Sequence, residues 1–236
     1  MRAENLPRLS GTKVKTKNVD YIHLYFLLND LEAAIKKYAN GHMLDLGCGN
    51  KPYENWYKQV TTSSVGCDII QSDQNRVDVI CLATELNFPD NTFDSVLCTQ
   101  VLEHVFENQQ LVKEAYRVLK PGGTIILTVP FCWQLHEEPY DFFRITKYGL
   151  ANLFTEAGFE IDHIKANGGK WAATFQMLNN TVHSTFKYKT FRAKILKIFF
   201  VELRGTWLIN KLAIWLDKRY FDESWTLNYL IIAKKP

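Results

Sequence analysis

The sequence lacks the features that mark several specialised classes of protein. Its 236 residues contain no run that approaches the roughly 18 consecutive apolar residues of a membrane-spanning helix. A secretory signal is not expected, because the N-terminus is polar and the first apolar run, from Tyr21 to Leu28, has only eight residues. No C-x-x-C pair is present among the five cysteines, Cys48, Cys67, Cys81, Cys98 and Cys132. We therefore expect a cytoplasmic protein whose cysteines are small buried residues.

Net charge is also small, at +3, but this sum hides an asymmetry. Residues 20–186 carry 12 Lys/Arg and 20 acids, net −8, whereas residues 187–219 carry nine Lys/Arg and two acids, net +7. The apolar fraction of 47% and the charged fraction of 22% are typical of a globular chain and exclude disordered and low-complexity classes. The length fits one domain with an appendage.

Short apolar runs alternate with helical spacing along most of the chain. The expected strands are 42–46, 64–70, 77–81, 93–99, 124–129, 159–165 and 227–233, and the expected helices are 20–39, 53–60, 109–119 and 146–157. Continuously apolar strands that alternate with helices are typical of a parallel sheet covered on both faces. The pattern predicts an α/β fold with a seven-stranded, mostly parallel sheet and a helical insertion before the last strand.

Two connections need comment. Only residues 71–76 separate the second and third strands, fewer than a parallel crossover usually needs, so either a helix is missing there or one strand is short. Lys120-Pro121-Gly122-Gly123 is expected to form a turn.

We divide the chain into a helical lead-in (1–40), an α/β core (41–165), a helical insertion or cap (166–226) and the last strand of the core (227–236).

A glycine turn follows the first strand. Asp45-Leu46-Gly47-Cys48-Gly49-Asn50 leads into a short helix, and Asp68 closes the second strand 19 residues past Gly49. In an open α/β sheet, ligands lie beyond the carboxyl ends of the strands, where an acid at this spacing binds ribose hydroxyls. Pro52 stands in the place of a third glycine, which argues against a dinucleotide pyrophosphate and so against a nicotinamide oxidoreductase.

Five motifs in order resemble the class I S-adenosylmethionine-dependent methyltransferases, in particular their small-molecule branch. They are Met43–Gly49, Gly66–Asp68, Leu86–Asp94, Val101–Val105 and Arg117–Gly123. The resemblance implies a Rossmann-like core, S-adenosylmethionine as cofactor, and methyl transfer. It places Asp45, Gly47 and Gly49 at the methionine end of the cofactor, Asp68 at the ribose, Leu82 and Ala83 beside the adenine, and Thr99 and Gln100 at the cofactor's edge. Many relatives carry an Asp where this chain has Leu82, so an apolar or backbone contact to adenine is implied.

The loop after the fifth strand, Pro130 to Arg144, is long and rich in titratable and aromatic residues, which favours a functional role. A hydroxyl acceptor must lose a proton during methylation, and a neutral imidazole can take it near pH 7. His136 is therefore a candidate base, with Glu137 or Asp141 to orient it. Alternatively, His136 only hydrogen-bonds the loop, and Asp141 and Arg144 pair to brace it. The pattern His-Glu-x-Pro-x-Asp-x-x-Arg resembles a subgroup associated with glycan or natural-product assembly.

Other histidines give less specific signals. Glu103-His104 follows the fourth strand and is interpreted as a helix-start acid with a packed His, in preference to a substrate contact. No metal site is expected, because the remaining histidines show no ligand spacing.

Residues 187–219 are apolar nearly all round and basic. They are interpreted first as a buried cap with a lid role. Peripheral contact with an anionic membrane or a homodimer face are the alternatives. Nucleic acid is not an expected partner, because the body of the chain is acidic.

The sequence thus predicts an S-adenosylmethionine-dependent methyltransferase that acts on an oxygen of a small molecule or a sugar or glycan precursor. The alternatives are an N- or C-methyltransferase of a natural product and a cofactor-binding, non-catalytic partner protein. The Asn-Pro-Pro-aromatic motif of amino-directed nucleic-acid methyltransferases is absent, and Val129-Pro130-Phe131 stands after the fifth strand instead.

Overall fold

A computed structural model describes residues 9–236, and their contacts form two compact units. The α/β unit contains Asp30–Lys165 and Tyr229–Pro236, and the helical unit contains Lys13–Asn29 and Ala166–Asn228. The first eight residues of the predicted lead-in lie outside the described residues. The predicted boundaries at 40, 165 and 226 remain predictions.

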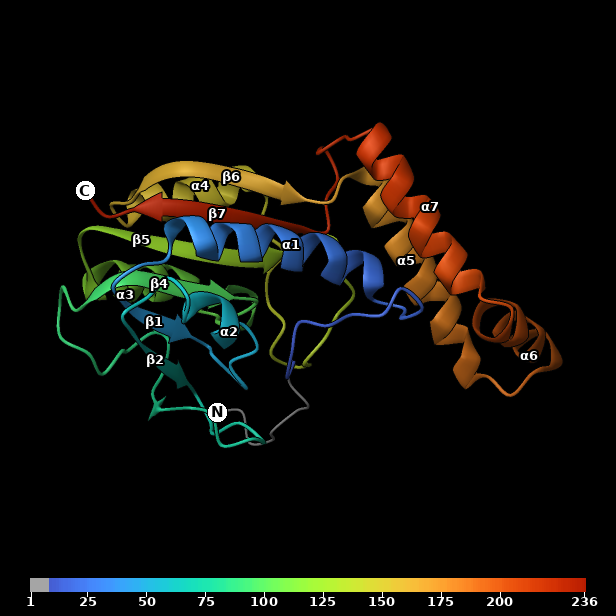
Figure 1. The fold of residues 1–236 in the computed structure, drawn as a ribbon, viewed down its shortest axis with the longest axis horizontal. Coiled ribbons are helices and arrows are strands. Elements are labelled where there is room, and N and C mark those ends of the chain that lie inside the picture. Colours follow the sequence, from blue (N-terminus) through green and yellow to red (C-terminus); the bar gives the residue numbers. More distant parts are fainter. Residues whose placement is uncertain (1–8) are drawn as a thin grey trace. The chain divides into compact units, whose positions relative to one another are not determined.

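The sheet of the α/β unit has seven strands in the order β3-β2-β1-β4-β5-β7-β6 (Figure 1). The strands are β1 (His42–Leu46), β2 (Ser63–Asp68), β3 (Val79–Ile80), β4 (Phe93–Thr99), β5 (Leu119–Pro130), β6 (Glu160–Asn167) and β7 (Asn228–Lys234). The pairs β1–β2, β1–β4, β2–β3 and β4–β5 are parallel. In Figure 1 the arrow of β7 runs opposite to those of β5 and β6. The expected mostly parallel, Rossmann-like sheet is therefore confirmed.

Helices cover both faces of this sheet. They are residues 30–38 of α1 (Tyr21–Tyr38), α2 (Glu54–Tyr57), the short 3-10 helix η1 (Leu102–His104), α3 (Asn108–Val118) and α4 (Lys147–Glu156). In Figure 1, this C-terminal part of α1 passes in front of the sheet and α3 and α4 lie behind it. The apolar face of α3 is fully buried, through Leu111, Val112, Ala115 and Val118, which explains why its helical spacing was visible in the sequence.

Two local predictions need correction. The third strand has only two residues, and the described chain has no helix between β2 and β3, so both explanations for the short connection hold. The expected turn at Lys120–Gly123 is wrong, because β5 already begins at Leu119. The glycines are held in the sheet because the Gly122 amide donates to the Lys235 carbonyl (2.7 Å) and the Lys235 amide donates to Gly123 (2.9 Å).

The register of the central strands brings three segments to one edge. Leu46 of β1 pairs with Cys67 of β2 and with Cys98 of β4. The next residue along each strand therefore lies at the same level of the sheet edge: Gly47 directly follows β1, Asp68 is the last residue of β2 and Thr99 is the last residue of β4. Ligands of open α/β sheets bind at this carboxyl edge.

The helical unit contains α5 (Lys170–Ser184), α6 (Phe191–Lys197) and α7 (Gly205–Arg219), with a 3-10 turn at Thr185–Lys187 and a π-helical turn at Ile198–Glu202. One face of α7 is buried and mostly polar, formed by Thr206, Asn210, Ala213 and Asp217. Asp217 accepts hydrogen bonds from the Gly169 and Ala172 amides, and Asn210 accepts one from Asn179 at 2.8 Å.

The large apolar side chains of residues 187–219 are mostly exposed, contrary to the expectation of burial. Phe191 is 77% exposed, Leu203 68% and Trp215 60%. Their burial was expected from composition alone, but polar residues occupy the buried face of α7. Within residues 9–236, no helix combines the length and the apolarity needed to cross a membrane.

Candidate functional site

The glycine turn after β1 has a backbone shape that a side chain would disturb. Gly47 has φ +74° and Gly49 has φ +48°. A Cβ at Gly47 would collide with the Val101 side chain. The amides of Gly47 and Cys48 both donate to the Cys67 carbonyl, at 2.8 and 3.0 Å, which folds the turn back onto the end of β2. Glycine at position 47 therefore keeps the backbone open toward the edge of the sheet.

Asp68 links the end of β2 to this turn. Its side chain is 5% exposed. One carboxylate oxygen accepts the Gly49 amide at 3.0 Å, and the other accepts the Ile69 amide at 2.8 Å. A carboxylate with four acceptor sites can take further hydrogen bonds from a ligand while it holds the turn.

Asp45 lies on β1 and is 2% exposed. Its Oδ2 accepts no hydrogen bond from any residue between 9 and 236. Burial raises the pKa of Asp45 to about 7, against the opposing effect of the Lys51 charge. A buried carboxyl with an open oxygen is costly without a partner, so a positively charged ligand group fits this position.

A cavity of about 370 Å³ opens beside the turn. Five predicted cofactor residues line it: Gly47, Asp68, Leu82, Ala83 and Gln100. The other three do not line it. Asp45 and Gly49 lie in the strand and turn that support it, and the Thr99 hydroxyl is hydrogen-bonded with Tyr53. The orphaned oxygen of Asp45 and the Gly47 cradle fit a nucleoside ligand with a cationic end.

The same cavity extends to residues from η1 and the loop after β5. These are His104, Val105, Phe106, Glu107, Glu137, Tyr140 and Phe142. Two hydrogen bonds join the two segments: the Phe142 amide donates to the Glu103 carbonyl (2.9 Å), and His104 Nδ1 donates to the Tyr140 carbonyl (2.7 Å). The sequence pattern indicates a functional aromatic loop but not its contact with η1, because no local pattern encodes that contact.

Asp141 organises the loop. Its carboxylate, whose side chain is 1% exposed, accepts two hydrogen bonds from Arg144, at 2.6 and 2.7 Å. It also accepts the His136 backbone amide and His136 Nδ1, both at 3.0 Å. Burial opposes the charge on Asp141, but the Arg144 and His136 hydrogen bonds outweigh it and lower the pKa of Asp141 to about 2. The structure thus brings His136, Asp141 and Arg144 together, while Glu137 turns into the cavity.

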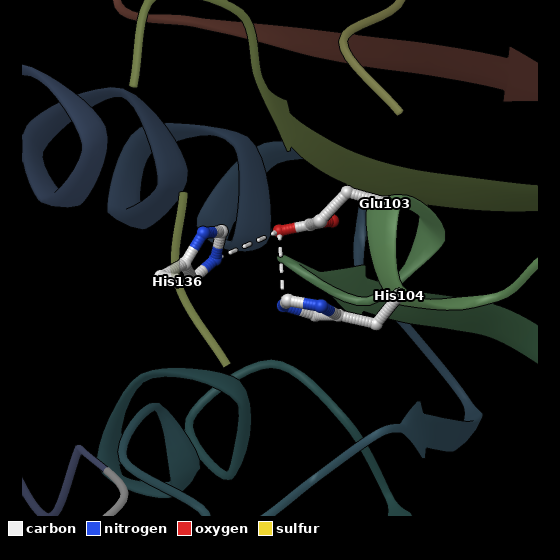
Figure 2. A group of neighbouring side chains, drawn as sticks. All are labelled: Glu103, His104 and His136. Atoms are coloured by element: carbon white, nitrogen blue, oxygen red, sulfur yellow. Dashed lines mark ion pairs between the residues drawn. The ribbon is translucent and has the colours of Figure 1, made fainter. Parts of the chain in front are cut away.

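Three potential metal ligands, Glu103, His104 and His136, lie close together, and His104 lines the cavity (Figure 2). Glu103 Oε1 lies 3.7 Å from His104 Nε2 and 3.9 Å from His136 Nε2. Glu103 is fully buried, and neither of its carboxylate oxygens has a hydrogen-bond partner among the described residues. Burial raises the pKa of Glu103 to about 8 and lowers that of His104. The simple helix-start role expected for Glu103 does not account for a fully buried, unpaired carboxyl.

Comparison with protein families finds one matching domain. Residues 44–127 match the model of a family described as "Methyltransferase domain". The match contains the glycine turn, Asp68, Leu82 and Ala83, and ends before the loop that carries His136.

Two relatives illustrate the extent of the similarity. A Mycolicibacterium smegmatis protein described as a probable S-adenosylmethionine-dependent methyltransferase is 28% identical over 138 residues, which cover 52% of this chain and 54% of that protein. An uncharacterized protein of Methanocaldococcus jannaschii is 32% identical over 146 residues, which cover 59% of this chain and 63% of that protein. The chain thus spans less than two thirds of the length of these relatives.

The fold also matches solved structures. A SAM-dependent methyltransferase from Archaeoglobus fulgidus superposes with a TM-score of 0.55 at 20% identity, covering 91% of this chain and 94% of that chain. At this identity the superposition establishes the shared fold alone.

Proposed function

We propose that this chain, which contains a class I S-adenosylmethionine-dependent methyltransferase domain, transfers a methyl group from S-adenosylmethionine to an oxygen atom of a small molecule or a sugar or glycan precursor. The observation that carries the proposal is the glycine turn joined to Asp68 beside a cavity of about 370 Å³. When bound, the cofactor supplies a methyl group on a positively charged sulfur.

Each predicted cofactor residue has a distinct task in this proposal. Asp68 accepts hydrogen bonds from the ribose hydroxyls, and Asp45 balances positive charge at the methionine end. Gly47 and Gly49 let the backbone approach the ligand. The adenine lies against Leu82 and Ala83. Gln100 borders the cofactor, and Thr99 lies behind Gln100.

The acceptor would lie at the end of the cavity formed by η1 and the loop. His104 and Glu137 line that end, and Glu103 and His136 stand behind them. Imidazole and carboxylate groups at this place suit an acceptor that must lose a proton, such as a hydroxyl group. His136 remains the base predicted from the sequence, oriented by Asp141, with Arg144 fixing Asp141.

An N- or C-acceptor and a non-catalytic cofactor-binding protein are the competing functions. Transfer of a labelled methyl group from S-adenosylmethionine into the small-molecule fraction of a cell extract separates enzyme from non-catalytic binder. Mass spectrometry of the labelled product then identifies the acceptor atom.

The pocket itself is tested by calorimetry with S-adenosylhomocysteine. Each hydrogen bond to a charged group contributes about 1.5–3 kcal/mol. We therefore expect Asp68→Ala to weaken binding by at least about tenfold. Asp73→Ala, which removes an exposed carboxylate from the same connection, is the matched control and should bind normally. Equal affinity of Asp68→Ala and the parent protein would refute the assigned pocket.

Residues 187–219 are proposed to contact an anionic membrane surface from the cytoplasmic side. The support is the combination of exposed Trp207, Leu208 and Trp215 with basic neighbours on a helix whose buried face is polar. Such a helix has the composition of an interfacial segment. A homodimer face or a lid would use the same exposed side chains, and these remain the alternatives.

A further inference from the structure

We propose that Glu103, His104 and His136 form a binding site for a divalent transition-metal ion at the acceptor end of the cavity. This proposal departs from the sequence-based expectation that the chain has no metal site. Its place beside an acceptor rests on the proposed function, but the metal site itself does not.

The spacing of the three groups suits a metal ion. Their ligand atoms all lie within 4.8 Å of one another, and Glu103 Oε1 is 3.7 and 3.9 Å from the two histidine Nε2 atoms. Ligands about 2.1 Å from a tetrahedral ion lie about 3.4 Å apart, so the two Glu103–histidine distances would close by a few tenths of an ångström and the two histidine nitrogens by no more than about 1.4 Å. Glu137 Oε2 lies 3.6 Å from His104 Nε2 and could serve as a further ligand.

Both imidazoles are oriented as metal-bound histidines usually are. A ligating histidine normally donates its other ring N–H to a carboxylate or a backbone carbonyl. Here His136 Nδ1 donates to Asp141 Oδ2 at 3.0 Å, and His104 Nδ1 donates to the Tyr140 carbonyl at 2.7 Å. Each hydrogen bond leaves Nε2 as the lone-pair nitrogen, and both Nε2 atoms face Glu103 (Figure 2).

Glu103 provides an independent observation. It is fully buried with both carboxylate oxygens unpaired among the described residues, although buried polar groups are almost always hydrogen-bonded. Glu137 and Asp141 add negative charge nearby, and Arg144 is the neighbouring cation. A divalent cation would satisfy the open oxygens of Glu103.

The donor set indicates the class of ion. Two imidazole nitrogens with one or two carboxylates suit Zn²⁺, Mn²⁺ or Fe²⁺ better than Mg²⁺ or Ca²⁺, which prefer oxygen ligands. With a cation bound, His136 would hold the ion and would not take up the acceptor's proton. An acceptor oxygen bound to the ion would release its proton to solvent more readily, because the cation lowers the pKa of the bound group.

The test uses the full chain, stripped with a chelator and then titrated with Mn²⁺ and, separately, Zn²⁺. Loss of the free Mn²⁺ signal in electron paramagnetic resonance and calorimetry with Zn²⁺ should both show one site. We expect Glu103→Gln and His136→Gln each to weaken binding at least tenfold, and Asp141→Asn to weaken it 10- to 100-fold by releasing His136.

The matched control is His163→Ala. His163 belongs to a second His–Asp pair, with Nδ1 2.9 Å from Asp162 Oδ2, on β6. The His163→Ala variant should bind both ions as the parent does. Circular dichroism confirms the fold of each variant, and His136→Gln serves if Glu103→Gln does not fold.

No binding of either ion, or equal binding by the parent, Glu103→Gln and His136→Gln, would overturn the metal site. S-adenosylhomocysteine binding is measured in parallel on the same stripped protein. Normal binding of that ligand without a metal site would leave the proposed function intact. A metal site without ligand binding would refute the cofactor pocket alone.

Discussion

Protonation of Asp45 should be coupled to cofactor binding, and this coupling can be measured directly. Burial raises the pKa of Asp45 to about 7 in the ligand-free protein. At that pKa the carboxyl is ~90% protonated at pH 6, ~50% at pH 7 and ~10% at pH 8. A ligand that places positive charge beside Oδ2 requires the charged carboxylate, because opposite charge favours the ionised form. Binding should therefore release ~0.9 proton at pH 6 and ~0.5 at pH 7 from this group.

Calorimetry of S-adenosylhomocysteine binding in buffers of different ionisation enthalpy gives the number of protons released. The ligand's own amino group, an amino-acid ammonium beside a carboxylate, stays protonated at pH 6 and pH 7, so these are the informative conditions. Asp45→Asn is the matched variant, since it keeps the shape of the side chain and removes the titration. Equal proton release by Asp45→Asn and the parent at pH 6 would refute the coupling.

The raised pKa of Asp45 also predicts how the stability of the protein depends on pH. A carboxylate in an ion pair stabilises the fold as pH rises, whereas Asp45 should destabilise it. The folded-state pKa of Asp45 lies above its unfolded value of 3.8. Below pH 4 both states are protonated, and the group has no effect on the free energy of unfolding. Between pH 4 and pH 7 only the unfolded state releases the proton, so the ligand-free protein loses stability as pH rises. In urea unfolding, the free energy of unfolding of Asp45→Asn should rise relative to that of the parent by about 4 kcal/mol between pH 4 and pH 7.

Two further predictions concern the turn and the basic helices. Gly47→Ala should lower the melting temperature and weaken S-adenosylhomocysteine binding at least tenfold, because it combines a positive φ with a collision at Val101, at a cost of about 1–3 kcal/mol for the backbone alone. Adding Val101→Ala should restore only part of this loss, and normal ligand binding by Gly47→Ala would show that the turn is not part of the pocket. In flotation assays the chain should rise with vesicles that contain phosphatidylserine, and Trp215→Ser should reduce that fraction. Absence from vesicles together with a dimer in light scattering would favour the homodimer alternative.

The sequence predicted the fold well because each strand carries its own signal. Strands such as β1 and β4 are buried along most of their length and contain short apolar runs, and α3 has a regular apolar face. The parts that it predicted poorly depend on distant partners. The start of β5 is a strand and not a turn because Lys235, directly after β7 at the other end of the chain, hydrogen-bonds Gly122 and Gly123.

The two ends of the candidate site also differ in how far the sequence could predict them. The cofactor end was predictable, since Gly47, Gly49 and Asp68 are positioned by strands next to them in the sequence. The acceptor end was not, because Glu103 and His136 come from separate segments. The two segments are joined by contacts such as the hydrogen bond from the Phe142 amide to the Glu103 carbonyl. The polar buried face of α7 was likewise hidden, since composition does not reveal which side of a helix packs inward.

The position of His136 limits the role it can play. Its Nδ1 is held by Asp141, so only Nε2 is left for chemistry, and Nε2 faces Glu103. The residues that line this end of the cavity include His104 and Glu137 but not His136. An acceptor would therefore contact His104 and Glu137 first. If a metal ion is bound at Glu103, His136 acts on the acceptor through that ion, and the His136–Asp141 pair fixes the ion's position. If it is not, a direct proton transfer to His136 requires the loop to bring Nε2 into the cavity.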